Sequence, residues 1–140
     1  MINAFPIALF FLCGGFSCIC DIKSGSVPRY LLWISTILSL VYQYIFIRGN
    51  FIFAVLGCIV GLFVFFLVKI ISGGKLGLGD IWFSSFSGST FGIWLWFPAT
   101  LISCLIAFVF MLPDIKRKIP FTPFLFTGSC LIFIYSFFIN

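Results

Sequence analysis

The chain has 140 residues, of which 63% are hydrophobic and only 8% are charged, and its net charge is +5. A soluble domain carries about 25% charged residues and could not bury this much apolar surface. Composition therefore excludes a soluble globular protein and predicts an integral membrane protein. Anionic lipid headgroups on the cytoplasmic side explain the positive charge, so membrane lipid is the expected contact and no nucleic-acid partner is expected.

Apolar stretches follow one another along the whole chain, separated by short polar loops. A helix of roughly 20 apolar residues crosses about 30 Å of hydrocarbon, whereas barrel strands would alternate polar and apolar residues. The fold class is therefore all-α, a polytopic membrane protein with one transmembrane domain over residues 1–140. We expect membrane helices over about 4–20, 30–47, 51–71, 79–91, 97–112 and 121–139.

The positively charged residues decide between five and six spans, because the uncharged stretch 81–113 is long enough for two short helices. Six spans place seven Lys and Arg residues on one side and only Arg48 on the other. Five spans divide them equally. Since positive residues collect in cytoplasmic loops, we predict six transmembrane helices with the N-terminus outside. The seven residues are Lys23, Arg29, Lys69, Lys75, Lys116, Arg117 and Lys118.

Cysteine usage does not indicate a metal site. The six cysteines lie inside apolar runs, none forms a CxxC pair, and the chain has no histidine. Zinc sites need ligands clustered at short spacing. We therefore expect neither a metal nor a cofactor, and we interpret the cysteines as small apolar residues of the helices.

Two aspartates stand at the ends of predicted spans. Asp21 ends the first span, and Asp80 begins the fourth in the stretch "LGLGDIW". Two crossings separate them, so both lie on the cytoplasmic side. Ionisable groups at membrane depth usually mark function, and two neighbouring carboxylates that share a proton can activate water as in aspartic proteases. Alternatively, Asp80 only caps its helix, and Asp21 is an interfacial charge near Lys23.

The neighbours of these aspartates refine the prediction. Gly77 and Gly79 remove side chains beside Asp80 and allow another backbone or a substrate strand to approach closely, although they could equally form a flexible loop. The third aspartate, Asp114, is followed by three cations at 116–118. A carboxylate among cations stays ionised, which suits a solvated surface pair and not a shared proton.

Three motifs resemble those of the type IV prepilin peptidases and the related archaeal preflagellin peptidases. "LGLGDIWFSSFSG" resembles their GxGD motif, "DIKSGSVPRYLL" their first aspartate motif, and "KIPFTPFLFTG" the proline-phenylalanine motif that opens the last helix. The resemblance implies an intramembrane aspartyl endopeptidase in the bacterial cytoplasmic membrane, which removes the short basic leader of a prepilin or pseudopilin substrate. Asp21 and Asp80 would be catalytic, and Gly77 and Gly79 would shape the substrate-binding site.

The chain departs from the family pattern at two positions. Trp82 stands where lysine is common, and Thr122 stands where glycine is common. The resemblance does not include the cytoplasmic domain of the larger enzymes, so we expect the chain to belong to their short, peptidase-only branch. Three alternatives remain open at this stage: a presenilin-like protease, a small transporter that uses membrane carboxylates, and a catalytically inactive relative. The inactive relative, favoured by Trp82, would be a membrane assembly partner of a pilus or secretion machine.

Overall fold

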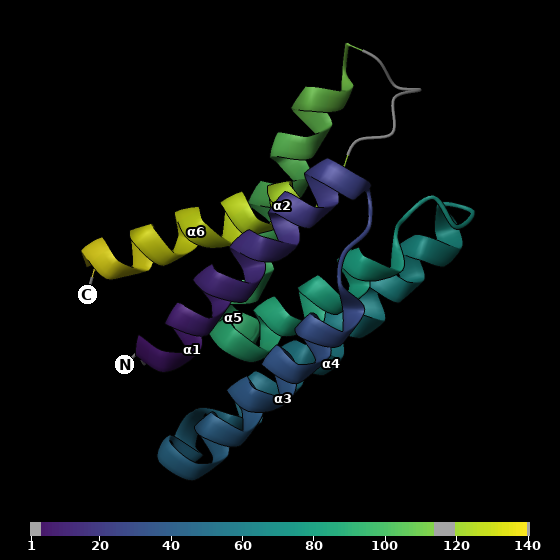
Figure 1. The fold of residues 1–140 in the computed structure, drawn as a ribbon. Coiled ribbons are helices and arrows are strands. Elements are labelled where there is room, and N and C mark those ends of the chain that lie inside the picture. Colours follow the sequence, from purple (N-terminus) through teal and green to yellow (C-terminus); the bar gives the residue numbers. More distant parts are fainter. Residues whose placement is uncertain (1–3, 114–119, 140) are drawn as a thin grey trace.

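The computed structural model describes residues 4–113 and 120–139, and every regular element among them is a helix (Figure 1). The first helix continues through α1 (Ala4–Leu9), the π-helical segment η1 (Phe10–Gly14) and α2 (Gly15–Ser24). It is followed by α3 (Arg29–Phe46), α4 (Arg48–Ile71), α5 (Leu78–Met111) and α6 (Thr122–Ile139). The all-α prediction is confirmed for the residues described.

Four of the described helical stretches are long and apolar enough to cross a membrane. They are Ala4–Ser24, Arg48–Ile71, Leu78–Phe110 and Thr122–Ile139. Helix α3 is not among them, because it carries several polar residues along its length. This set of helices indicates a multi-pass membrane protein.

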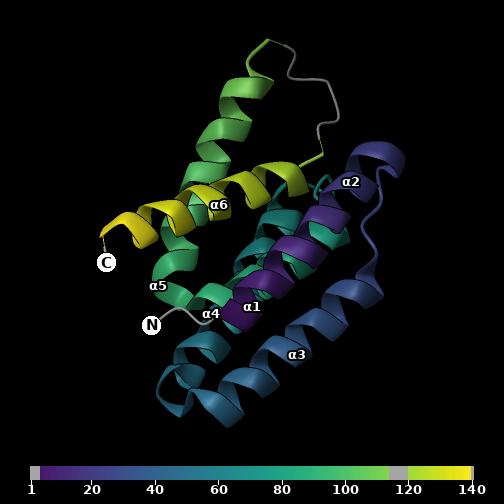
Figure 2. The same ribbon diagram turned by 60° about the vertical axis from the view of Figure 1, so that its left-hand side comes forward.

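Helix α5 bends sharply at Gly92, between the two spans that the sequence predicts for this region. Gly92 has φ 72° and ψ 170°, a conformation that glycine adopts at little cost because it has no Cβ. The first half of α5 runs beside α4, and the second half turns back toward the end of the molecule at which α5 begins (Figures 1 and 2). The sequence predicts a loop over 92–96, but the helical backbone is interrupted only at Gly92.

Helix α3 supplies polar groups to the broken turn of α5. In an unbroken helix the Ser89 carbonyl would accept a hydrogen bond from the N–H of Ile93, and the non-helical backbone at Gly92 comes between these two groups. The Gln43 amide donates to the Ser89 carbonyl oxygen at 2.5 Å, and the Ser39 hydroxyl lies 3.5 Å from the same oxygen. Since lipid offers no hydrogen bonds, the buried polar face of α3 stabilises the bend.

Close backbone contacts fix the two halves of α5 to different helices. Gly57 of α4 packs directly on the backbone of Gly88, so that a Cβ at either position would overlap the other chain segment. On the second half, a Cβ at Gly128 of α6 would lie 2.6 Å from the Ala99 carbonyl oxygen. Small residues allow membrane helices to approach in this way. The first half of α5 is therefore held by α4 and the second half by α6.

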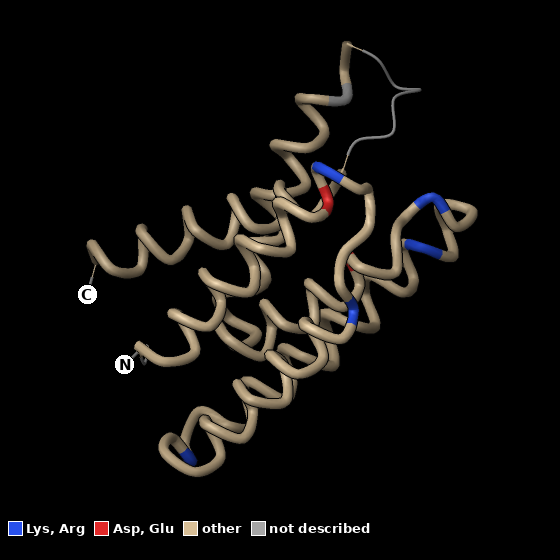
Figure 3. The backbone as a smooth tube through the Cα atoms, viewed as in Figure 1, with Lys and Arg blue, Asp and Glu red and all other residues tan. Residues whose placement is uncertain are grey.

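The ends of the helices divide the described cations into two groups. Lys23 and Lys69 lie in the last turns of α2 and α4, Arg29 begins α3, and Lys75 precedes α5. The blue segments of Figure 3 show these helix ends on one side of the molecule, whereas Arg48, which begins α4, lies at the opposite end. The described cations thus follow the division on which the sequence-based topology rests.

Candidate active site

Two helices bring their aspartates to the same end of the molecule. Asp21 lies near the end of α2 and exposes 9% of its surface, and Asp80 lies in the first turn of α5 and exposes 8%. Helix α2 ends just after Asp21, because Gly25 adopts a left-handed conformation with φ 64° and its N–H donates to the Asp21 carbonyl oxygen at 2.9 Å. Both carboxylates are thus held at helix ends but are largely shielded from solvent.

A third helix reaches both aspartates through Thr122, the first residue of α6. Its hydroxyl donates to Asp80 Oδ1 at 2.7 Å, and the Thr122 side chain has no exposed surface. The side chain and the backbone N–H of Thr122 also lie against the carboxylate of Asp21. Helices α2, α5 and α6 therefore meet at this residue.

The two carboxylates are close enough to interact electrostatically. Burial penalises each negative charge, and a second negative charge nearby adds repulsion. One proton shared by the pair removes that repulsion, and pairs of this kind supply both a base and an acid to aspartic proteases. Asp21 Oδ2 is buried and has no hydrogen-bond partner within the described protein, although buried polar atoms are nearly always paired. This oxygen can accept a hydrogen bond from a water or a substrate group.

The aspartates line a cavity of about 270 Å³. Its walls come from the end of α2, the connection from α2 to α3, and the start of α5. Nine residues line it: Asp21, Gly25, Ser26, Val27, Arg29, Gly77, Leu78, Gly79 and Asp80. All four residues that the sequence predicts as site residues lie on this cavity.

The two glycines before Asp80 have different surroundings. A Cβ at Gly77 would lie 3.3 Å from Asp80 Oδ2, whereas a Cβ at Gly79 would lie only 2.6 Å from the Cβ of Val27. Gly77 thus leaves space beside the Asp80 carboxylate, where we expect a substrate strand to approach. Gly79 has an additional packing reason, because it lets the first turn of α5 lie against the connection that follows α2.

Of two further residues singled out by the sequence, one lies away from the cavity and the other falls outside the part of the chain that the structure describes. Trp82 packs on Trp33 of α3, with ring centroids 4.7 Å apart, and it is not among the residues that line the cavity. Asp114 lies outside the described residues. Conversely, the sequence does not predict Thr122 as a site residue. The available signal is a hydroxyl residue at the very start of the last span, next to Pro123.

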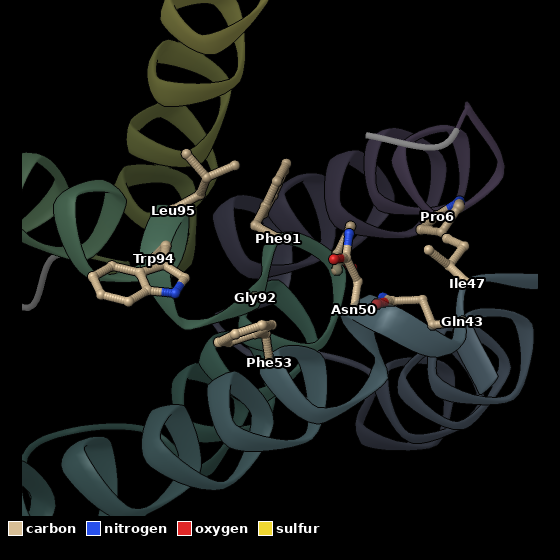
Figure 4. Close-up of a pocket in the computed structure, with 10 residues that line it drawn as sticks. Pro6, Gln43, Ile47, Asn50, Phe53, Phe91, Gly92, Trp94 and Leu95 are labelled. Carbon is tan, nitrogen blue, oxygen red and sulfur yellow. The ribbon is translucent and has the colours of Figure 1, made fainter. Parts of the chain in front are cut away.

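A second cavity of about 270 Å³ lies at the bend of α5, with Gly92 in its wall (Figure 4). Gln43, Asn50 and Thr90 are the polar side chains among its described lining residues, and none of these residues carries an acid, a base or a thiol. Within residues 4–113 and 120–139, no group of three His, Cys, Asp or Glu side chains could hold a metal ion. Proton-transfer chemistry therefore points to the cavity of the two aspartates.

Comparison with known proteins points to the same part of the chain as the candidate active site. Neither the curated proteins nor the solved structures contain a significant match. A family model described as the type IV leader peptidase family matches residues 7–112. The matched range includes Asp21, Gly77, Gly79 and Asp80 and ends before Thr122. Because this match covers most of the 140 residues, the chain belongs to the type IV leader peptidase family.

Proposed function

We propose that this protein is an intramembrane aspartic endopeptidase, which removes the short basic leader peptide of type IV prepilin-like proteins at the cytoplasmic face of the bacterial membrane. The observation that carries the proposal is the juxtaposition of two buried carboxylates, Asp21 and Asp80, on one cavity. Family membership supports the choice of a leader peptide as substrate.

The proposed topology has six crossings and an outer N-terminus. The bend at Gly92 supports two crossings within α5. The aspartates lie at the same end as most of the described cations, and cations favour the cytoplasmic side. The cavity would therefore open toward the cytoplasm, where the leader of a newly made prepilin is located.

In the proposed reaction, one carboxylate is ionised and the other carries the shared proton. The ionised carboxylate takes a proton from a water, and the water oxygen attacks the carbonyl carbon of the scissile peptide bond. The protonated carboxyl gives its proton to the carbonyl oxygen, which produces a tetrahedral intermediate. When the carbon–nitrogen bond breaks, the carboxyl that now holds the proton gives it to the leaving amine, and the other carboxylate takes a proton from a hydroxyl of the intermediate, so the pair again shares one proton. Asp21 Oδ2, unpaired within the described protein, is suited to bind that water.

Co-expression with a prepilin tests the proposal. Asp21→Asn and Asp80→Asn should each abolish the mobility shift that accompanies leader removal, at an unchanged membrane level of the protein. Asp114→Asn is the matched control and should leave cleavage largely intact, because a carboxylate among cations stays ionised. Loss of cleavage in Asp114→Asn, together with normal cleavage in Asp21→Asn, would identify a different pair. Absence of any cleavage by the wild type would favour the inactive relative.

A further inference from the structure

We propose that Thr122 is a positioning residue, which holds the carboxylates of Asp21 and Asp80 in one arrangement from helix α6. The inference rests on the proposed function, since it concerns the same pair of aspartates. It adds a third residue to the site, from a helix that lies beyond the matched family region.

The contacts of Thr122 reach both aspartates from a fully buried position. Its hydroxyl carries one proton, which is donated to Asp80 Oδ1 at 2.7 Å. Its backbone N–H lies against the carboxylate of Asp21. On the other side of the same residue, the Cys18 thiol lies 3.8 Å from the Thr122 carbonyl oxygen. Donor groups of Thr122 thus face both carboxylates, and the contact with Cys18 links Thr122 to α2.

The start of α6 explains why these donors are available. The first N–H groups of a helix have no acceptor within the helix, so the Thr122 N–H is free to face Asp21. The next residue, Pro123, has no N–H and has a fixed φ that suits a first helical turn. The carbonyl oxygen of Phe121 accepts from the N–H groups of Phe124 and Leu125 at 3.0 and 3.1 Å, which fixes the turn that presents Thr122.

A hydroxyl at this position constrains the pair in a way that a smaller residue would not. Glycine at position 122, for example, has no hydroxyl and would leave Asp80 Oδ1 without this donor. In this chain the hydroxyl fixes the orientation of the Asp80 carboxylate relative to Asp21. Because the reaction needs both carboxylates around one water, a small change in that orientation should slow the chemical step more than substrate binding.

Two substitutions separate positioning from simple packing. Thr122→Val keeps the shape of the side chain and removes the hydroxyl, whereas Thr122→Ser keeps the hydroxyl and removes the methyl group. If Thr122 only filled space, serine would be the more harmful change. If Thr122 positions the carboxylates, Thr122→Val should be the more harmful change, because it removes the hydroxyl.

Cleavage kinetics provide the first measurement. The purified protein is reconstituted in liposomes with a synthetic peptide that has a basic leader, a glycine and an apolar helix. Thr122→Val should lower kcat by roughly 10- to 100-fold with little change in KM, and Thr122→Ser should retain most of the turnover. Turnover by Thr122→Val at the wild-type rate, or an equal loss in both variants, would overturn the inference while leaving the proposed peptidase function intact.

Thermal unfolding provides a second measurement that needs no activity. Thr122→Val should lower the unfolding midpoint clearly in the wild-type background and much less in an Asp80→Ala background, because the hydrogen bond couples the two sites. Equal shifts in both backgrounds would refute the Thr122–Asp80 contact. If the wild type cleaves no prepilin-type peptide, the proposed function fails. The comparison of unfolding midpoints in the two backgrounds still decides whether Thr122 and Asp80 are coupled.

Discussion

Replacement of Gln43 by methionine tests the explanation of the bend in α5. The substitution keeps an unbranched side chain of similar length but removes the amide that donates to the Ser89 carbonyl oxygen at 2.5 Å. A buried acceptor without a partner costs about 1–3 kcal/mol, and side-chain hydrogen bonds between membrane helices contribute about 0.6 kcal/mol on average, with a maximum of about 1.7. The Ser39 hydroxyl remains at 3.5 Å as a weaker donor. We therefore expect a loss of about 1–2 kcal/mol in the free energy of unfolding.

The assay is unfolding in detergent micelles titrated with sodium dodecyl sulfate and followed by circular dichroism. Thr36→Val is the matched control on the same helix. Its hydroxyl donates to the Leu32 carbonyl oxygen at 2.7 Å, and this oxygen lies within the continuous helix α3, so the loss should stay below about 0.5 kcal/mol. If Gln43→Met is as stable as the control, the amide does not stabilise the bend and the reasoning is wrong.

Three further predictions concern packing and topology. Gly79→Ala should reduce cleavage, because its Cβ would meet the Val27 side chain at 2.6 Å, whereas Gly49→Ala has open space and should cleave normally. Gly57→Ala should cost about 1–3 kcal/mol of stability in the same detergent unfolding assay, since the new methyl group would overlap the backbone of the first half of α5. In a variant without the native cysteines, a membrane-impermeant thiol reagent added outside should label Gly49→Cys but not Lys116→Cys. Labelling of position 116 from outside would show that residues 81–113 cross the membrane only once.

The sequence could predict the features that depend on hydropathy and on the number of crossings. Long apolar runs predict membrane helices directly, because lipid requires a satisfied backbone. Counting the predicted helices between Asp21 and Asp80 leads to the expectation that both lie on one side of the membrane. Their proximity is a weaker inference, since it requires α2 and α5 to pack at the same end. The packing in the structure places both on one cavity.

The remaining features depend on tertiary contacts that local patterns do not encode. The gap between the predicted spans 79–91 and 97–112 contains Gly92, but local sequence does not show that the helical backbone is interrupted at this residue alone. The bend is stabilised by Gln43, which is distant in sequence. Thr122 could not be assigned to the site for the same reason, because its hydroxyl meets Asp80 only after α6 docks on α5.

Mass spectrometry of a cleavage reaction tests the central claim most directly. The purified protein in liposomes is incubated with a prepilin-type peptide, and the masses of the products locate the cleaved bond. The wild type should release the basic leader by a single cut after its glycine, while Asp21→Asn and Asp80→Asn, at equal protein amount and with wild-type helical content, should release none. Continued release of the same fragment by both variants would contradict a catalytic role for these two aspartates.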